Sequence, residues 1–414
     1  MHAKPGIIAV LDIGDTKIVC FVAQIDHGGA VRIIGIGHQV AKGLKSGMIT
    51  DMHEVENSVV AAVHAAEQMA GETIEDVMVS LSGMHLTSRN ISVEMEVPGS
   101  SVTERDMADL ISEGSASVAT DKLEIIHCLP IAYFLDENRG IRDPRGLFGK
   151  KLGAELHVVL APSDLLRNIA HCIGRCHLNV VRYIVASYAS GLACLEADEM
   201  ELGATIVDIG GGVTSIAVFV GGNLMYADAI PIGSAHVTSD LAQGLSTSLY
   251  HAERIKTLHG NVVPAANDSQ TMVEVPQLGE EDEDGDGHYV PRSMVVSIAR
   301  PRMEEIFEMV RAKLEGAQMD KVAGRRVVLT GGGSQLLGVR ELATQMLGKQ
   351  ARIGRPKDVS GLADAVSGPA FASVIGMLQF SDRRVMETDV LDQTRGAMGG
   401  TRFQRFLHWI KENF

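Results

Sequence analysis

Aromatic residues are scarce in this sequence: one Trp, six Tyr and ten Phe stand among 414 residues. Proline is also infrequent, with 12 residues, and cysteine occurs only five times. These counts exclude collagen-like, low-complexity and disulfide-scaffold proteins, and the 45% of hydrophobic residues is typical of a globular chain. We therefore expect an aliphatic, Met-rich core, and the length predicts two or more domains.

The cysteines are an odd number spread along the chain, which is typical of reduced thiols: Cys20, Cys128, Cys172, Cys176 and Cys194. Cys172 and Cys176 lie next to His171 and His177, so a zinc site is one interpretation. The same cysteines continue an apolar stripe at helical spacing, and no second ligand pair follows. A buried helix face is therefore favoured over zinc.

Long apolar runs and net positive charge are missing too. No segment approaches the 18 or so apolar residues of a spanning helix, and residues 1–10 lack a cationic start followed by a long apolar run, so a cytoplasmic location is predicted. The net charge of -15 argues against nucleic acid as a partner, because phosphate binding needs a cationic surface. Any contact with an anionic membrane must be local.

A pattern of strands followed by a glycine turn occurs twice. Strands are predicted over 7–11, 18–22 and 31–36, followed by a helix over 51–70 with Asp51 as its cap. A second array covers 204–207, 216–220 and 224–230, and its Ile206–Gly210 segment matches Val10–Gly14. Two homologous lobes are the economical explanation, although two such turns could coincide in any α/β protein.

The rest of the chain has weaker signals. Residues 82–161 loosen into short strands at 93–97, 125–130 and 156–160, which we interpret as an inserted subdomain. A helix over 302–315, a strand over 326–329 and a last helix over 371–380 follow. The acidic run 279–287 lacks the spacing of an EF-hand, so a solvated loop is favoured over a calcium site.

Three glycine-rich turns carry the predicted chemistry. Glycine admits positive φ and has no Cβ, so such turns expose backbone N–H groups to phosphate. The first turn contains Asp12, Gly14, Asp15, Thr16 and Lys17, and the second contains Asp208, Gly210, Gly211 and Gly212. Asp12 and Asp208 would each hold Mg²⁺ through water, and Lys17 would neutralise phosphate charge.

The third turn, Gly331, Gly332 and Gly333, is expected to lead from a strand into a helix, where a base or phosphate can approach the backbone. None of the three turns fits a Rossmann fingerprint or a Walker loop.

The two Asp-x-Gly hairpins with the triple glycine resemble the actin-like ATPases. Nearly the whole chain resembles the FtsA family of bacterial cell-division proteins, and the matching segments are Leu11–Gly14, Val207–Gly212, Ala252–Lys256, Leu329–Gly333 and Val374–Gly376. The resemblance implies an α/β, two-lobed actin-like (ribonuclease H-like) ATPase fold that binds ATP and Mg²⁺. It also implies that Glu253 and Lys256 contact the ribose and adenine; without it they would be ordinary solvated helix residues.

The resemblance further implies the domain boundaries. Subdomain 1A covers 1–82 and 162–196, with a return at 366–380, and the inserted subdomain 1C covers 83–161. Subdomain 2A covers 197–238 and 302–365, around subdomain 2B at 239–301. A flexible linker at 381–400 precedes a membrane-targeting amphipathic helix at 401–414.

Two departures from the family pattern bear on nucleotide chemistry. Asp15 stands where the family usually has a hydroxyl residue, which adds a negative charge near the phosphates. The segment 186–190, which resembles the family's first connecting segment, has no Gln, Glu or Asp to orient an attacking water. No catalytic residue is assigned, and slow hydrolysis at best is predicted; a turnover above about one per second would contradict this.

The C-terminal helix has one apolar stripe, made of Phe403, Phe406, Leu407, Ile410 and Phe414. Arg402 and Lys411 flank the stripe and Trp409 lies to one side, a pattern that suits the interface of an anionic membrane. Docking of this helix on its own domain is the alternative, and the polar segment in front of it favours the membrane.

The resemblance implies a protein that tethers filaments of the tubulin-like FtsZ to the inner face of the cell membrane at the division site. It implies self-assembly into filaments and contacts with downstream division proteins. Arg300 and Arg302 are candidates for binding the FtsZ C-terminal tail, although exposed helix-cap arginines would look the same. The alternatives are an actin-like scaffold of another membrane machine, such as pilus assembly, and a small-molecule kinase of the same fold.

Overall fold

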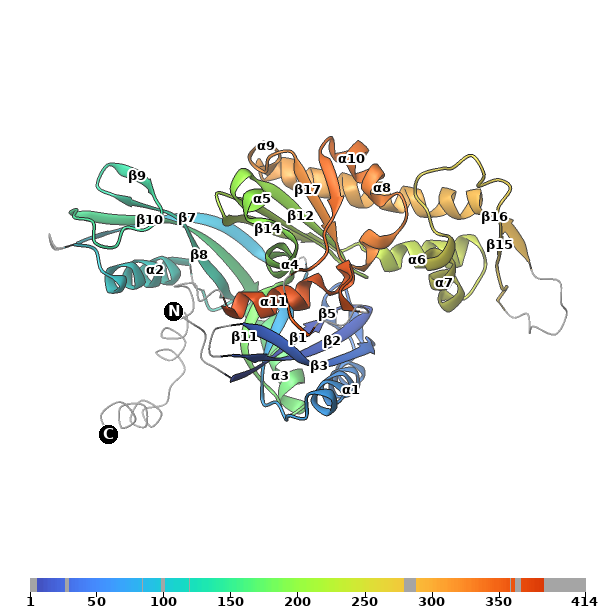
Figure 1. The fold of residues 1–414 in the computed structure, drawn as a ribbon, viewed down its shortest axis with the longest axis horizontal. Helices are drawn as coiled ribbons and strands as arrows, with labels where there is room; N and C mark the ends of the chain where they lie inside the picture. Colours follow the sequence, from blue (N-terminus) through green and yellow to red (C-terminus); the bar gives the residue numbers. More distant parts are fainter. Residues whose placement is uncertain are drawn as a thin grey trace. The chain divides into compact units, whose positions relative to one another are not determined.

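The computed structural model describes residues 6–26, 30–83, 85–97, 101–118, 120–278, 288–357, 359–361 and 366–382. These residues form two compact units, a smaller one of residues 89–160 and a larger one that holds the rest (Figure 1). The acidic run 279–287, the helix expected at 401–414 and the linker after residue 382 lie outside the described residues.

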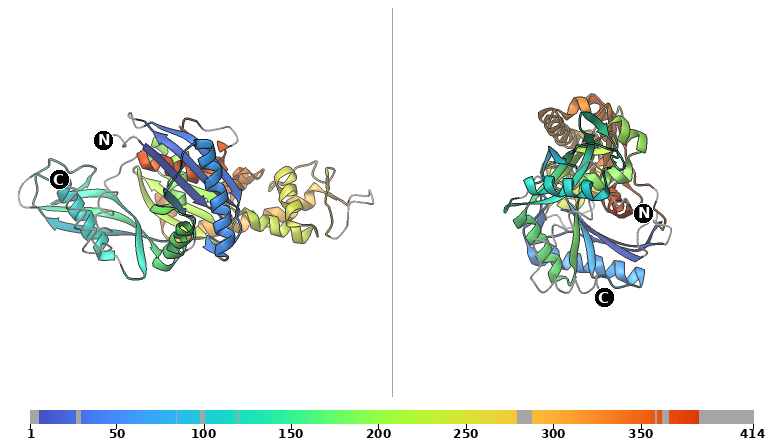
Figure 2. Two further views of the ribbon diagram at one scale, coloured as in Figure 1. Left: turned by 90° about the horizontal axis from the view of Figure 1, so that it is seen from below. Right: turned by 90° about the vertical axis from the view of Figure 1, so that its left-hand side faces the viewer.

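The first sheet of the larger unit has the strand order β11-β6-β1-β2-β3. Its strands are β1 (Gly6–Ile13), β2 (Lys17–Ile25), β3 (Val31–Val40), β6 (Asp76–Leu81) and β11 (Asn179–Val185). The first three form an antiparallel meander, and β6 and β11 continue the sheet in parallel with β1. Helix α1 (Met52–Ala70) packs across β2 and β3 (Figure 2), and Asp51 caps it by accepting from the His53 and Glu54 N–H groups.

The second sheet repeats this topology, with the order β14-β13-β12-β17-β18. Its strands are β12 (Ala204–Ile209), β13 (Thr214–Val220), β14 (Asn223–Ile230), β17 (Arg326–Thr330) and β18 (Gln350–Ile353). Again the first three are antiparallel, and the last two continue in parallel with β12. The prediction of two homologous lobes is confirmed, because strand order and direction agree throughout.

A helix follows the last strand of each sheet: α4 (Ala186–Cys194) after β11 and α11 (Ala372–Asp382) after β18. The two helices pack directly against each other (Figure 1). Gly376 of α11 makes the approach possible, since an added Cβ would lie only 1.8 Å from the Ala189 carbonyl oxygen of α4. Helix α11 also continues two residues into the segment predicted to be a linker from 381.

The lobe built on the second sheet, called the second lobe, carries additional helices between β14 and β17. They are α6 (Ser234–Gly244), α7 (Leu249–His259), α8 (Arg292–Gly316) and α9 (Met319–Val322), with the short strands β15 (Met272–Glu274) and β16 (Tyr289–Pro291). The prediction that the long helix begins at 302 was wrong. Pro301 lies inside α8, but Val295, Ala299 and Met303 continue one buried stripe across it, and this packing outweighs the lost hydrogen bond.

Three further helices complete the larger unit: α3 (Ser163–Arg175), α5 (Ala197–Leu202) and α10 (Val339–Leu347). In α3, Cys172 is buried as predicted, whereas His171 is exposed. Burial raises the pKa of Cys172 to about 11, so its thiol stays protonated. Within the described ranges, no helix is both long and apolar enough to cross a bilayer.

In its described residues the smaller unit is a four-stranded sheet with one helix. The elements are β7 (Thr87–Glu96), α2 (Glu104–Val118), β8 (Leu123–Leu135), β9 (Asn138–Ile141) and β10 (Lys151–Pro162), in the sheet order β7-β10-β8-β9. Helix α2 was not predicted, because Gly114 and Ser115 interrupt its apolar stripe. Gly114 lets α2 pack closely on the core, since an added Cβ would lie 2.5 Å from Leu156 Cδ1.

A buried histidine makes the stability of the smaller unit depend on pH. His157 Nδ1 lies 2.7 Å from Asn90 Oδ1, so Nδ1 carries the proton. The other ring nitrogen, Nε2, is buried and has no hydrogen-bond partner within the described ranges. Burial, and secondarily His127, lowers the pKa of His157 to about 4.

The unfolded chain therefore binds more protons than the folded chain between about pH 6.5 and 4. We expect stability to fall as the pH falls through this window, with a slope of up to about 1.4 kcal/mol per pH unit from this group. Urea denaturation of the full chain followed by circular dichroism would measure the slope. The His157→Gln variant should show a flatter profile, and equal slopes would contradict the assignment.

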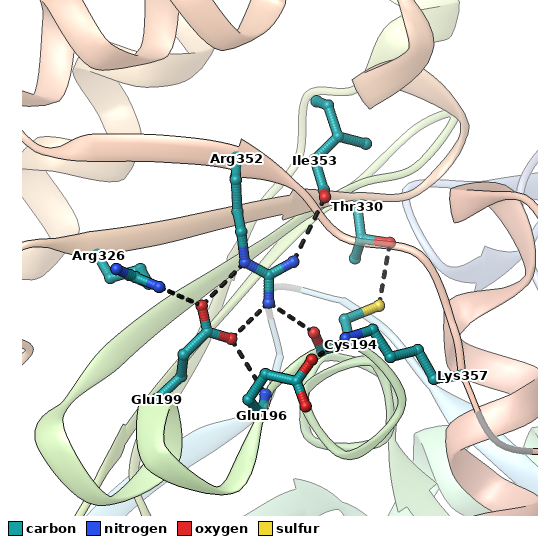
Figure 3. Close-up of polar contacts among 8 residues, drawn as sticks. All are labelled: Cys194, Glu196, Glu199, Arg326, Thr330, Arg352, Ile353 and Lys357. Atoms are coloured by element: carbon teal, nitrogen blue, oxygen red, sulfur yellow. Dashed lines mark hydrogen bonds and ion pairs between the residues drawn. The ribbon is translucent and has the colours of Figure 1, made fainter.

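A buried carboxylate joins the end of α4 to the second sheet (Figure 3). Glu199 of α5 accepts hydrogen bonds from Arg326 of β17, at 2.9 Å, and from Arg352 of β18. Arg352 also donates to the Cys194 carbonyl oxygen at the last residue of α4. Burial alone would raise the pKa of Glu199, but the two arginines hold it below its usual value.

Replacing Glu199 by glutamine should lower the free energy of unfolding by about 2 kcal/mol, because both arginines lose their counter-charge. The cost stays below that of a fully buried pair because Arg326 and Arg352 keep 49% and 32% of their side chains exposed. Urea denaturation measures the change. Glu196→Gln is the matched control, since Glu196 pairs with Lys357 at the surface and should cost less than about 0.5 kcal/mol; equal costs would refute the argument.

Candidate nucleotide site

The two predicted hairpin turns have the same geometry. In the first turn, residues 14–17, the Gly14 N–H donates to the Lys17 carbonyl oxygen at 3.0 Å. In the second turn, residues 210–213, the Gly210 N–H donates to the Val213 carbonyl oxygen, also at 3.0 Å. Each turn thus has two residues at its tip, joining β1 to β2 and β12 to β13.

The tips of the two turns face each other closely. An added Cβ on Gly211 would lie 2.3 Å from Thr16 Cγ2, and one on Gly212 would lie 1.7 Å from Asp15 Oδ2. A side chain at either position would therefore displace Thr16 or Asp15 or move the turns apart. The structure brings together the phosphate-binding residues that the sequence predicts from segments nearly half the chain apart.

The triple glycine lies beside the second turn. Gly331 has φ +80, and an added Cβ there would meet Asp208 Oδ1 at 2.3 Å. An added Cβ on Gly333 would lie 2.4 Å from Ile209 Cγ2, while Gly332 has open space around it. Glycine is thus required at the first and last of the three positions, which lets this turn approach the end of β12.

The prediction that the triple glycine begins a helix was wrong. Gly332–Gln335 form a single 3₁₀ turn, and α10 begins only at Val339. The Gly331 N–H is already bonded to the Pro369 carbonyl oxygen at 3.1 Å.

The helix that begins at the site is α6. The N–H groups of its first two residues, Ser234 and Ala235, donate to the Gly210 and Gly211 carbonyl oxygens at 2.8 and 2.9 Å. This helix therefore holds the backbone of the second turn in place.

The two aspartates occupy equivalent places at the ends of β1 and β12, and both are half-buried. Asp12 Oδ1 accepts from Ser80 Oγ at 2.5 Å and from Ser373 Oγ at 3.3 Å. Asp208 Oδ2 accepts from Ser190 Oγ at 2.5 Å. Burial, with a smaller contribution from the Asp12 charge, raises the pKa of Asp208 to about 6 against the opposing Ser190 hydrogen bond.

The serines were not among the predicted site residues. Ser190 lies on α4 and Ser373 on α11, so each of the two packed helices sends one hydroxyl to one aspartate. Ser80 comes from β6 and also accepts the Ile13 N–H at 3.2 Å. Their only sequence signal is a hydroxyl within an apolar run, a feature too common to indicate a site.

Lys17 lies close to both aspartates. Its Nζ donates to the Ala370 carbonyl oxygen and is 3.9 Å from the centre of the Phe371 ring. Burial lowers the pKa of Lys17, while the charges of Asp12 and Asp208 oppose that shift. The ammonium is therefore held at the ends of β1 and β12, where charge neutralisation of a phosphate is useful.

Glu253 and Lys256 project from α7 onto the first turns of α6. Lys256 Nζ lies 2.8 Å from Thr238 Oγ1, 2.7 Å from Glu253 Oε2 and 3.2 Å from the Ser234 carbonyl oxygen. Thr238 Oγ1 also donates to Glu253 Oε2 at 2.5 Å. Only 11% of the Lys256 side chain is exposed, so it is not an ordinary solvated residue. Through Ser234 the pair is joined to the second turn.

Arg300 and Arg302 lie on α8 and are held by carboxylates of the same lobe. Arg300 Nε pairs with Glu304 at 2.7 Å, and Arg302 Nε pairs with Asp240 at 2.6 Å. Arg302 also contacts Glu305. Their role in binding a partner stays a prediction.

The predicted membrane-binding residues, 402–414, lie outside the described part of the chain.

The donor set fits a nucleotide with a hydrated divalent cation. Within the described residues, serine hydroxyls use only one oxygen of Asp12 and one of Asp208. The other oxygens suit the water shell that Mg²⁺ retains in proteins. Asp15 Oδ2, at the tip of the first turn, is buried and has no hydrogen-bond partner in the part of the chain that the structure describes, so it is an acceptor available to a ligand.

Comparison with solved structures identifies the fold. The PilM-PilN type IV pilus biogenesis complex matches with a TM-score of 0.64 at 17% identity, over 91% of this chain and 98% of that one. MreB5 of Spiroplasma citri bound to ADP matches with a TM-score of 0.55 at 12% identity, over 95% and 99%. The class of this protein is therefore the actin-like ATPase fold, as predicted.

Comparison at the level of sequence identifies the family. The model of cell division protein FtsA matches residues 205–376, and that of the SHS2 domain inserted in FtsA matches residues 83–160. Cell division protein FtsA of Rhizobium meliloti is 41% identical over 99% of this chain and 96% of its own length. The protein of Escherichia coli strain K12 is 30% identical over 99% and 98%. The chain belongs to the FtsA family of cell division proteins.

Proposed function

We propose that this protein is an ATP-binding adaptor that tethers FtsZ filaments to the inner face of the cytoplasmic membrane. In this proposal it polymerises and helps to recruit further division proteins. The proposal of ATP binding rests on the two facing turns, with Asp12, Asp208 and Lys17 together at the ends of β1 and β12. Membership of a cell-division family supports the rest.

In the proposed complex, the backbone of the two turns and the triple glycine contacts the phosphates, and Lys17 offsets their charge. Asp12 and Asp208 hold Mg²⁺ through its water shell, and Ser373 and Ser190 orient these carboxylates. Bound Mg²⁺ supplies positive charge that neutralises the phosphate chain. Glu253 and Lys256 are positioned by α6 for the ribose and adenine. The ADP bound to MreB5, which shares the fold, supports the binding of an adenine nucleotide.

The same site gives little support for rapid hydrolysis. The residues of α4 nearest the site are alanine, tyrosine and serine, and Ser190 is bonded to Asp208. None of them is a base that orients a water molecule. A steady-state ATPase assay tests this: we expect turnover well below about one per second, and a faster rate would contradict the assignment.

The membrane part of the proposal depends on the sequence of residues 401–414. A helix of this length is marginal by itself and binds weakly as one copy, so filaments that present many copies would convert weak contacts into firm attachment. Co-sedimentation with anionic liposomes, with and without ATP and FtsZ, tests this attachment. A chain ending at residue 400 should stay in the supernatant.

A pair of substitutions separates the apolar stripe from a general charge effect. Phe406→Glu places a carboxylate in the stripe and should abolish co-sedimentation while ATP binding is kept. His408→Glu places a carboxylate on the face of the predicted helix opposite the apolar stripe. This variant should retain most of the co-sedimentation. Equal sedimentation of the two variants would refute the membrane role.

The proposed FtsZ contact at α8 is testable with Arg300. Arg300→Ala should weaken binding of an FtsZ C-terminal peptide, because it removes a guanidinium that exchanges its partner Glu304 for a peptide carboxylate. Arg311→Ala is the control, since Arg311 lies on the same helix beside α10, where it donates to the Met346 carbonyl oxygen, and pairs with Glu315. Equal affinities in the two variants and the parent protein would contradict this site.

A further inference from the structure

Asp15 is fixed in place by a small hairpin of the first lobe. The strands β4 (Leu44–Lys45) and β5 (Met48–Ile49) are joined by Ser46 and Gly47, whose φ values are +50 and +77. The Gly47 N–H donates to Asp15 Oδ1 at 2.9 Å. Burial raises the pKa of Asp15, and hydrogen bonding from the Gly47 and Ser46 backbone opposes that shift. Two consecutive N–H groups in left-handed conformation form a concavity that suits an anion. Asp15 is therefore anchored and cannot swing out of the turn freely.

The other oxygen of Asp15 points at the second lobe. Among the described residues the buried Oδ2 has no hydrogen-bond partner, and Gly212 of the second turn leaves the space that Oδ2 occupies. A buried carboxylate oxygen without a donor is unfavourable, so a ligand that brings a donor to this point is favoured. Gly211 leaves the corresponding space for Thr16. The side chains of the first turn thus face the backbone that is proposed to hold the phosphates.

The charges around this point are mainly negative. Asp12 and Asp208 lie at the ends of β1 and β12, the strands that lead into the two turns. Their charges oppose the lowering of the Lys17 pKa by burial. Its ammonium already contacts the Ala370 carbonyl oxygen and the Phe371 ring. The charge of the His236 side chain on α6 lowers the pKa of Asp15, against the larger effect of burial. A polyanionic phosphate chain entering without a cation would meet three carboxylates.

We propose that Asp15 makes the nucleotide site selective for the magnesium complex of ATP over metal-free ATP. The inference rests on the proposed nucleotide binding and assigns a specificity-determining role to one residue of that site. A water molecule of hydrated Mg²⁺ is the donor that Asp15 Oδ2 lacks, whereas a bare phosphate oxygen brings only like charge. Because the hairpin at Ser46 and Gly47 holds Oδ1, the repulsion is not relieved by rotation of the side chain.

Isothermal titration of ATP into the full chain, with excess MgCl₂ or with EDTA at about pH 8, tests this. The measured quantity is the affinity with MgCl₂ divided by the affinity with EDTA. Asp15→Asn keeps the shape of the side chain and removes the charge, and Asp15→Thr places there a hydroxyl of the kind usual in the family. We expect either variant to show a ratio at least about tenfold smaller than the parent protein, or about 1.4 kcal/mol less dependence on Mg²⁺.

Glu72→Gln is the matched control. Glu72 is an exposed carboxylate that precedes β6, at the opposite end of the first sheet from the turns, and its replacement should leave the ratio unchanged. Each variant is first checked for an intact melting transition by circular dichroism. If both Asp15 variants keep the parent ratio, the role of Asp15 is wrong. If the parent protein binds no ATP even with Mg²⁺, the proposed nucleotide site itself is wrong.

Discussion

Replacing Gly376 by alanine should lower the free energy of unfolding by at least about 3 kcal/mol. An added Cβ would lie 1.8 Å from the Ala189 carbonyl oxygen and 2.3 Å from its carbonyl carbon. Both are backbone atoms of α4, so no side chain can rotate to make room, and the two helices must separate. Urea denaturation of the full chain followed by circular dichroism measures the loss.

The same substitution should also damage the nucleotide site. Ser190 of α4 and Ser373 of α11 each bond one of the two aspartates, so separating the helices displaces both hydroxyls. ATP affinity should fall together with stability. Gly174→Ala is the control, because Gly174 lies in α3 with open space around it and should gain up to about 1 kcal/mol from the better helix propensity of alanine. Similar losses in the two variants would refute the packing argument.

Replacing Lys17 by methionine should weaken the binding of ATP with Mg²⁺ by about 100-fold, which corresponds to about 2.7 kcal/mol. Methionine keeps much of the side-chain length but removes the ammonium, and with it the charge and the contacts of Nζ with the Phe371 ring and the Ala370 carbonyl oxygen. Without the ammonium, Asp12 and Asp208 are left without a cation beside them, and their repulsion of phosphate increases. Isothermal titration measures the change.

Lys122→Met removes one positive charge from an exposed turn of the smaller unit and should leave ATP affinity within about twofold. A loss below about threefold in Lys17→Met would show that Lys17 serves the fold and not the phosphates. Thermal melting separates the two roles, since a structural lysine would lower the melting temperature even in the absence of ATP.

Much of the fold was predictable because its signals are local. The apolar runs of β1 and β2, the cap at Asp51 and the repeated strand–Asp–x–Gly segments each occupy fewer than about twenty consecutive residues. The repeat then predicted two lobes, and the structure confirms the shared strand order. Helix α2 was missed because its apolar stripe includes small residues. The start of α8 was missed because its stripe passes through Pro301. In both helices only the packing shows which face is buried.

The glycines of the three turns were determined by the sequence alone, since backbone freedom is a property of each residue. The partners of Asp12, Asp15 and Asp208 were decided only by the tertiary structure. Asp12 bonds a serine 361 positions away, and Asp15 is anchored by a hairpin 32 positions away. A hydrogen bond across such a distance requires the sheets and helices to be in place first, and sequence pattern extends only over neighbouring residues. Which carboxylate is satisfied, and which is left to meet a ligand, is therefore a property of the folded chain.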